Sequence, residues 1–227
     1  MLLHLKQVFT PEQVKEVRKH LDSAQWKDGK VTAGNASREQ KNNLQLAQDN
    51  PLAIELGNFV LQTLGQREDF MSSALPAKIF PPMFNRYEGG GEFGFHVDNA
   101  IRQVPNTPVK IRTDLSMTIF FSEPDEYDGG ELVIEDTFGQ QKIKLAAGDM
   151  VVYPSTSLHK VTPVTRGARV SAFFWLQSLV KSNDHRRTLH ELDQSIQALR
   201  RDMPNDQRVQ NLIWVYHNLL REWSETN

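Results

Sequence analysis

The chain has 227 residues, a formal net charge of −2 at pH 7 and no cysteine. Its hydrophobic fraction of 39% and charged fraction of 24% are typical of a globular protein and argue against disorder. The lack of cysteine excludes disulfides, zinc–thiolate sites, iron–sulfur clusters and thiol nucleophiles. The near-neutral charge provides no basic field for nucleic acid, and no segment resembles a signal peptide or a membrane span. We therefore expect a cytoplasmic protein that binds neither nucleic acid nor membranes.

The first part of the chain predicts one short strand and two helices. Residues 2–9 alternate as in a strand, and the Thr-Pro-Glu-Gln sequence of residues 10–13 is typical of a helix start. Its threonine suits the N-cap, its proline the first turn and its glutamine the returning side chain of a capping box. An apolar stripe predicts that this helix ends near residues 26–29. Residues 30–50 are polar and give no clear prediction, and a second helix is predicted to begin at Pro51.

From about residue 77 the hydrophobic pattern changes from helical to strand periodicity. Short runs of β-branched and aromatic residues, separated by glycine and proline turns, are typical of a sandwich or barrel. About eight such runs with helices before them favour an α+β fold with a double-stranded β-helix, or jelly-roll, core. The predicted strands cover residues 79–87, 93–98, 109–121, 131–135, 141–145, 150–154, 161–164 and 168–177.

After Ser178 helical periodicity returns. Two apolar stripes, at residues 189–199 and 209–223, lie on either side of Pro204 and predict a helical hairpin. Covering an exposed face of the sheet is the simplest role for this hairpin. Substrate gating is one alternative, and a homo-oligomer interface, for which the second stripe is long enough, is the other. The predicted domains are an N-terminal helical and strand support region at residues 1–76, a jelly-roll core at 77–178 and a C-terminal helical extension at 179–227.

His96 and Asp98 are the first candidate metal ligands. They are two residues apart on a predicted strand, so both side chains point to the same face. A second histidine would complete the set of two histidines and one carboxylate that suits non-haem Fe(II). His159, which follows the predicted strand at residues 150–154, is the candidate, although each residue alone is more often a surface residue. The remaining histidines fall in helical or terminal segments and are predicted to be surface or core residues: His4, His20, His185, His190 and His217.

Arg169 and Ser171 share one face of the predicted strand at residues 168–177, whose opposite face is apolar. A buried arginine is costly without an anion, and its planar guanidinium binds a carboxylate through two hydrogen bonds. The hydroxyl of Ser171 can add a third hydrogen bond, and the phenol of Tyr87 could reach the same anion. A salt bridge between Arg169 and a glutamate on a neighbouring strand is the structural alternative.

Several motifs occur together: His96-x-Asp98, the Asp-Gly-Gly turn at residues 128–130, the segment Ala-Gly-Asp-Met-Val-Val-Tyr-Pro at 147–154, His159 and Arg169-x-Ser171. Together they resemble the prolyl-4-hydroxylase branch of the Fe(II)- and 2-oxoglutarate-dependent dioxygenases. Over nearly its full length the chain resembles the bacterial PKHD-type hydroxylases of the PiuC type. The resemblance implies that His96, Asp98 and His159 hold Fe(2+). It also implies that Arg169 holds the distal carboxylate of 2-oxoglutarate, with Tyr87 and Ser171 as assistants.

The activity implied by this resemblance is hydroxylation by O2 of an unidentified substrate, coupled to conversion of 2-oxoglutarate into succinate and CO2. L-ascorbate is expected to rescue oxidised iron. The family label suggests a prolyl or lysyl side chain or a small molecule of iron uptake as the substrate. Residues 99–109, which contain Arg102, are predicted to be a substrate-facing loop, with an ordinary connection as the alternative.

Two other functions compete with this one. A cupin-like metal protein would bind a small organic acid without oxidising it, but cupins usually present more histidine ligands. A β-sandwich interaction module would carry the histidines incidentally, but it would have no use for a buried Arg169.

Overall fold

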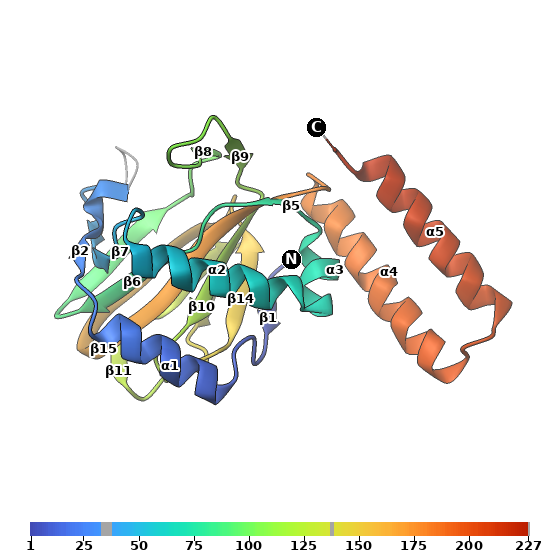
Figure 1. The fold of residues 1–227 in the computed structure, drawn as a ribbon. Coiled ribbons are helices and arrows are strands. Elements are labelled where there is room, and N and C mark those ends of the chain that lie inside the picture. Colours follow the sequence, from blue (N-terminus) through green and yellow to red (C-terminus); the bar gives the residue numbers. More distant parts are fainter. Residues whose placement is uncertain (33–37, 137–138, 227) are drawn as a thin grey trace.

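The computed structural model describes residues 1–32, 38–136 and 139–226. Two antiparallel sheets share one long strand and face each other, with helices on the outside of the larger sheet, so the fold is the predicted α+β double-stranded β-helix (Figure 1). The larger sheet has the order β1 (Leu3–Leu5), β14 (Met150–Pro154), β10 (Leu115–Phe120), β15 (Leu158–Ser178), β6 (Met83–Glu88), β4 (Leu44–Gln45) and β2 (Lys27–Asp28).

The smaller sheet is built on the first half of β15, and the larger sheet on its second half. Because the strand crosses from one sheet to the other, residues at its two ends reach the same space between the sheets. Besides β15, the smaller sheet contains β3 (Lys41–Asn42), β7 (Gly91–His96), β11 (Tyr127–Gly129), β12 (Leu132–Asp136) and β13 (Gly139–Ile143). Strand β5 (Pro76–Ile79) pairs with the end of β15, in the larger sheet. Strands β8 (Ile101–Gln103) and β9 (Lys110–Arg112) pair with each other.

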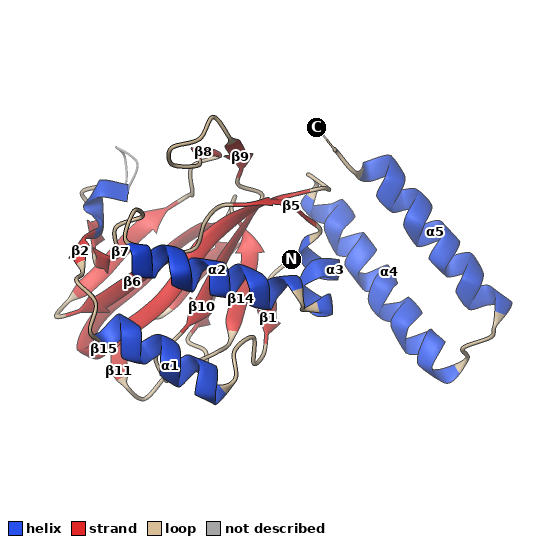
Figure 2. Cartoon of the chain, in the orientation of Figure 1, coloured by secondary structure: helices blue, strands red, loops and turns tan. Residues whose placement is uncertain are grey.

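Helices cover the outer face of the larger sheet and form a separate hairpin at one end (Figure 2). Apolar side chains of the first three α-helices pack with that face into the largest core cluster. The helices are α1 (Pro11–Asp22), η1 (Gly29–Thr32, a 3₁₀ turn), α2 (Pro51–Gly65), α3 (Glu68–Ala74), α4 (Asn183–Asp202) and α5 (Gln207–Trp223).

Strand alternation separates this core from the space between the sheets. On β10, Leu115, Met117 and Ile119 pack into the core under the helices. The intervening Ser116 and Thr118 are also buried, and they lie on the opposite face, toward the smaller sheet. The residues of β15 alternate in the same way, so the polar side chains of both strands gather inside the double-stranded β-helix.

The predicted start of the first helix is confirmed, and its predicted end is wrong. Thr10 Oγ1 accepts a hydrogen bond from the Gln13 amide, and the Gln13 side chain accepts one from the Thr10 amide. The predicted end at residues 26–29 lies beyond the observed end at Asp22. At this end the Leu21 carbonyl accepts from the Ala24 amide and from the indole of Trp26, which folds back, so the carbonyl is satisfied without a further helical turn.

Strand β1 is also shorter than the predicted strand at residues 2–9. The chain leaves the sheet at Gln7, which has a φ of 48°, and the amide of Gln7 donates to the Asp149 carboxylate. The second helix begins at Pro51 as predicted, with Asn50 as its N-cap. Helix α3 was not predicted, because its seven residues are too few to show a helical period.

Two predicted strand boundaries are corrected. The predicted strand at residues 109–121 is divided into β9 and β10, because the Asp114 carboxylate turns inward to accept from the Ser178 amide and to pair with Arg112. The predicted strands at residues 161–164 and 168–177 form one strand, β15. Gly167, with a φ of 68°, bends this strand between the two sheets rather than ending it.

The predicted C-terminal hairpin is present. Helix α4 packs against α3 and α5, and α5 is the helix farthest from the sheets (Figure 1). The hairpin contacts the body through a small cluster centred on Leu75, Val180 and Leu189. Its interface role remains a prediction, as does the domain division. No helix in the described part of the chain combines the length and apolar character needed to cross a membrane.

Candidate metal centre and anion pocket

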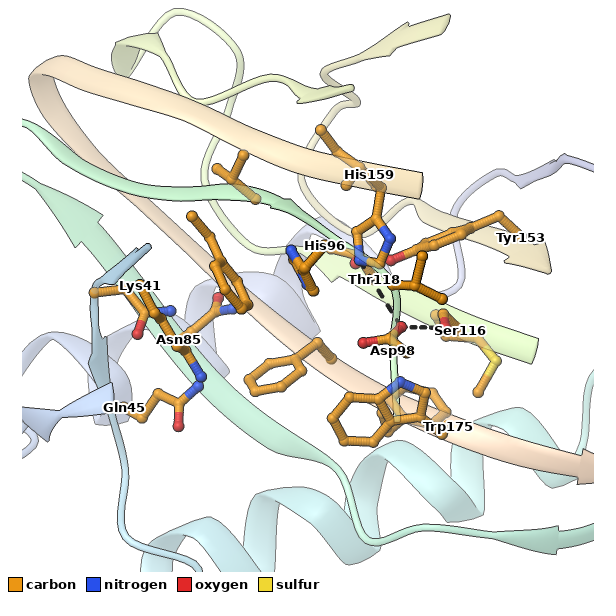
Figure 3. Close-up of a pocket in the computed structure, with 18 of the residues that line it drawn as sticks. Lys41, Gln45, Asn85, His96, Asp98, Ser116, Thr118, Tyr153, His159 and Trp175 are labelled. Carbon is orange, nitrogen blue, oxygen red and sulfur yellow. Dashed lines mark hydrogen bonds and ion pairs between the residues drawn. The ribbon is translucent and has the colours of Figure 1, made fainter. Parts of the chain in front are cut away.

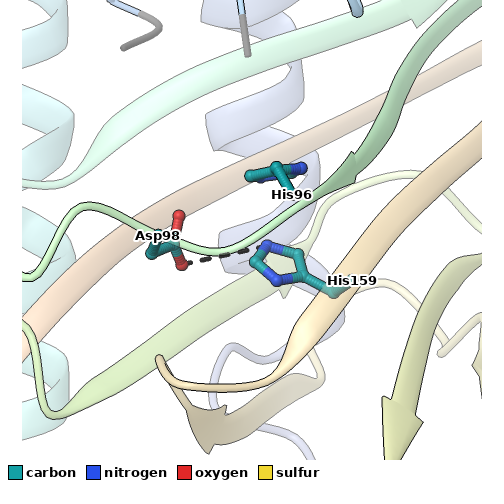
Figure 4. Close-up of side chains that lie close together, drawn as sticks. All are labelled: His96, Asp98 and His159. Atoms are coloured by element: carbon teal, nitrogen blue, oxygen red, sulfur yellow. Dashed lines mark ion pairs between the residues drawn. The ribbon is translucent and has the colours of Figure 1, made fainter. Parts of the chain in front are cut away.

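The three predicted metal ligands meet at one end of the space between the sheets. His96 is the last residue of β7, and Asp98 lies in the segment that follows. The prediction that this strand continues to Asp98 is therefore wrong. His159 lies near the start of β15, directly across from His96 in the strand pairing. One ligand atom from each residue lies within 4.8 Å of the others. Figure 4 shows the two imidazoles and the carboxylate converging from these segments.

The backbone fixes the orientation of both imidazoles. His96 Nδ1 lies 2.8 Å from the Gly94 carbonyl, and His159 Nδ1 lies 3.0 Å from the Ser157 carbonyl. A carbonyl only accepts, so each Nδ1 carries a proton, and Nε2 is the ring nitrogen through which each histidine can bind a metal. Burial, followed by the neighbouring His159, lowers the pKa of His96 to about 4, so the imidazole of His96 is neutral at pH 7.

Ser116 fixes the third ligand. Its hydroxyl donates to Asp98 Oδ2 at 2.6 Å and also lies 2.7 Å from the hydroxyl of Ser155. Asp98 Oδ2 lies 3.8 Å from His159 Nε2. Sequence reasoning assigned no role to Ser116, although strand alternation places it on the opposite face from Leu115 and thus toward the pocket. Two imidazole nitrogens and one carboxylate on one side fit Fe(II) with open positions.

Arg169 is 1% exposed and has no anionic partner among the residues that the structure describes. Its guanidinium lies 5.3 Å from the centre of the Tyr87 ring and 5.0 Å from that of Phe120. Nη1 donates to the Ser171 hydroxyl at 2.8 Å, and Nε has no hydrogen-bond partner. The alternative of a salt bridge to a neighbouring glutamate is therefore wrong within the described chain. A buried cation of this kind requires an anion, and the described residues do not supply one.

Asn85 completes the support of Arg169 and was missed by sequence reasoning. The Ser171 hydroxyl donates its single proton to Asn85 Oδ1 and accepts from Arg169. Asn85 lies opposite Ser171 in the pairing of β6 with β15, and Tyr87 lies opposite Arg169. Burial raises the pKa of the Tyr87 phenol, which therefore stays protonated and available as a donor.

One pocket joins the three candidate ligands to Arg169, with about 720 Å³ of space that includes its open mouth. In Figure 3 the histidines and Asp98 lie on one side of this pocket and Lys41, Gln45 and Asn85 on the other, with Trp175 beside Asp98. Lys41 is 3% exposed, and burial lowers its pKa to about 7. The pocket thus contains both the candidate metal centre and the buried guanidinium of Arg169, which has no anionic partner among the described residues.

The other histidines lie outside this pocket, as predicted. His4 pairs with Asp149 at 2.6 Å, and His20 lies 3.1 Å from Glu16 on the same helix. Within the described part of the chain, no other group of three metal-ligating side chains has the required spacing. The remaining three histidines lie on the C-terminal hairpin: His185, His190 and His217.

Two family models match the chain. Residues 82–177 match the 2OG-Fe(II) oxygenase superfamily, and residues 184–225 match the PKHD-type hydroxylase C-terminal domain. The first range contains the three candidate ligands and Arg169, and the second covers most of the helical hairpin.

Similar proteins and structures agree with these matches. A PKHD-type hydroxylase of Saccharophagus degradans is 59% identical over 100% of both chains, and the PKHD-type hydroxylase PiuC of Pseudomonas aeruginosa is 58% identical over 99% of this chain and 100% of its own. A prolyl-4-hydroxylase structure from Pseudomonas putida has a TM-score of 0.51 at 18% identity, covering 78% of this chain and 92% of that one. The structure shares the fold alone, whereas identity near 59% over the full length establishes the family. The chain belongs to the PKHD-type hydroxylases, a family of Fe(II)- and 2-oxoglutarate-dependent dioxygenases.

Proposed function

We propose that His96, Asp98 and His159 hold Fe(II), that Arg169 holds the distal carboxylate of 2-oxoglutarate, and that the protein hydroxylates a carbon of its substrate with release of succinate and CO2. The observation that carries this proposal is the buried guanidinium of Arg169 in the same pocket as the three ligand atoms. A metal centre alone would not explain why Arg169 is buried without a counter-ion among the described residues.

The protein's part in this reaction is to position and shield the reactants. When bound, iron and 2-oxoglutarate supply the activation of O2 and the oxidative decarboxylation. Asp98 adds one negative charge to the metal face, and Ser116 holds that carboxylate in place. The two Nδ1–H groups stay bonded to backbone carbonyls, so the imidazoles cannot rotate away from the metal.

In the same pocket, Arg169 is the proposed carboxylate anchor. A bidentate contact would satisfy Nε, which has no hydrogen-bond partner in the described part of the chain. We assign Tyr87 as a second donor to the same carboxylate. Ser171 is assigned chiefly to hold Arg169, because its proton already goes to Asn85; its direct contact with 2-oxoglutarate remains a prediction.

Other expectations stay at the level of proposals. L-ascorbate as a reductant, a cytoplasmic location and a homo-oligomer through α4 and α5 all remain predictions. Membership of a hydroxylase family does not favour the non-oxidative cupin-like alternative or the interaction module. For the substrate, prolyl or lysyl side chains and small molecules of iron uptake remain the predicted classes.

Succinate formation tests this function. Protein supplied with Fe(II), 2-oxoglutarate and O2 should release succinate slowly even without substrate. His96→Ala should abolish this release and weaken Fe(II) binding. The matched control His20→Ala, which removes a half-exposed histidine on α1, should change neither. Absence of both succinate release and iron-dependent 2-oxoglutarate binding in the wild-type protein would refute the proposed function.

A further inference from the structure

A second arginine, Arg102, lies at the same pocket and is not used by the function proposed above. It is the central residue of β8, and its guanidinium carbon lies 3.9 Å from the centre of the Trp175 ring and 5.2 Å from that of Phe80. Its Nε is buried without a hydrogen-bond partner, and no carboxylate of a described residue forms an ion pair with it. Stacking on aromatic rings explains its position and leaves Nε without an acceptor among the described residues.

Lys41 places a second positive charge nearby. Its ammonium lies 5.2 Å from the centre of the Phe93 ring and 5.9 Å from that of Phe173. Phe173 and Trp175 are neighbours on the pocket face of β15, with ring centres 5.7 Å apart. Lys41 and Arg102 therefore stand over adjacent aromatic rings, and the charge of Arg102 contributes to the lowered pKa of Lys41.

The charges in the loaded pocket do not balance without a further anion. Asp98 is the acidic residue among the described residues that line it, beside the cations Lys41, Arg102 and Arg169. The two charges of Fe(II) together with Arg169 offset Asp98 and the two carboxylates of 2-oxoglutarate. Positive charge then remains in excess at Arg102 and at Lys41, whose pKa of about 7 leaves it partly protonated at neutral pH. Arg102 is stacked on rings in a half-buried place, where a charge costs more than in water.

We propose that Arg102 binds a carboxylate of the prime substrate, which is a small organic acid whose body lies along the Trp175 and Phe173 rings. The inference rests on the proposed function, because it places the second anion beside a metal centre that already holds 2-oxoglutarate. Arg102 offers the planar pair of donors that a carboxylate accepts, and Lys41 adds positive charge from above the neighbouring Phe173 ring.

The hairpin that carries Arg102 fits this role. The predicted loop at residues 99–109 contains β8 and part of a turn, and β8 pairs with β9 instead of forming an irregular connection. Asn99 and Arg102 both line the pocket, close in sequence to Asp98. A substrate held by Arg102 would thus lie next to the metal-binding segment, where a carbon can approach the iron.

Binding of benzoate tests this proposal, with the neutral analogue benzamide as its comparison. The full chain is loaded with Mn(II) and 2-oxoglutarate, so that Arg169 is occupied, and Mn(II) broadens the proton resonances of any probe bound near the metal. We expect saturable benzoate binding with broadening, and benzamide binding at least about tenfold weaker. Arg102→Gln should weaken benzoate binding at least about tenfold, and Arg102→Lys, which keeps the charge, should restore part of it.

Two controls separate this proposal from the function on which it rests. Lys110→Gln removes a charge from the exposed side of the same hairpin and should leave benzoate binding unchanged. Arg102→Gln should bind 2-oxoglutarate like the wild-type protein, whereas failure of the proposed function would appear as loss of metal-dependent 2-oxoglutarate binding in the wild type. The proposal would be overturned by any of three results. Benzoate shows no saturable binding, benzamide binds as tightly as benzoate, or Arg102→Gln binds benzoate as tightly as the wild type.

Discussion

Replacing Arg169 by methionine separates the cost of burying its charge from the benefit of binding 2-oxoglutarate. Methionine keeps most of the side-chain length between the Tyr87 and Phe120 rings and removes the cation. In the protein without 2-oxoglutarate, the guanidinium is 1% exposed and has no carboxylate partner among the described residues. Its loss should therefore leave the free energy of unfolding unchanged or raise it, because an unpaired buried charge opposes folding.

Binding of 2-oxoglutarate should show the opposite effect. Removing one partner of a buried, hydrogen-bonded charge pair costs about 2–5 kcal/mol. A central value of about 3 kcal/mol corresponds to an increase of roughly 100-fold or more in the Kd of 2-oxoglutarate. Ligand-induced stabilisation grows with ligand concentration relative to Kd, so 2-oxoglutarate with Mn(II) should raise the Tm of the wild-type protein far more than that of Arg169→Met.

Thermal unfolding and calorimetric titration measure these two quantities on the same samples. Arg166→Met is the matched control, because Arg166 lies on the same strand and forms an exposed pair with Asp128. That control should lose at most about 1 kcal/mol of stability and bind 2-oxoglutarate normally. Wild-type affinity for 2-oxoglutarate in Arg169→Met would refute the assignment of Arg169.

Three further predictions concern the metal ligands and one turn. The pKa of His96 in the folded protein, about 4, lies below its ordinary value of 6.5, so the free energy of unfolding should fall as the pH is lowered from 6.5 to 4. Denaturant titrations across this pH range should find a smaller fall in His96→Gln. An equal fall in both proteins would contradict the assignment of this pH dependence to His96. Ser116→Ala frees the Asp98 carboxylate and should weaken Fe(II) binding about 10–100-fold in an anaerobic titration, so unchanged affinity would show that the hydrogen bond is dispensable. Gly129→Ala should destabilise the protein by more than about 3 kcal/mol, because the φ of Gly129 is 74° and the new Cβ would overlap the Pro163 carbonyl oxygen. The control Gly89→Ala, at a φ of 57° with open space around the new Cβ, should cost about 1–2 kcal/mol. Similar losses of unfolding free energy in the two variants, measured by chemical denaturation, would argue against the overlap.

The sequence predicted the parts of the fold and site that depend on local pattern. Alternation identified Val170 and Ala172 as core residues of β15 and put Arg169 and Ser171 on the other face, which the structure confirms. The His-x-Asp spacing gave two of the three clustered ligands. His159 was identified as their partner through its place in the chain, and the register of β15 with β7 explains why it arrives there.

Features that depend on contacts between distant segments could not be predicted. The division between β9 and β10 arises from the hydrogen bond of Asp114 to Ser178, which are 64 residues apart. Gly167 looked like the end of a strand because glycine marks both turns and bends, and only the pairing of both flanking segments distinguishes them. The support given by Asn85 to Ser171 likewise depends on the pairing of β6 with β15.

Iron-dependent binding of 2-oxoglutarate in the wild-type protein and in Asp98→Ala is the most direct test of the metal centre. Asp98 is the one anionic member of the ligand cluster, and its carboxylate lies 3.8 Å from His159 Nε2. An anaerobic titration with Fe(II) and 2-oxoglutarate should give tight, metal-dependent binding to the wild type and strongly weakened binding to Asp98→Ala, together with loss of succinate release. Full binding and full succinate release in Asp98→Ala would contradict the assignment of His96, Asp98 and His159 as the iron ligands.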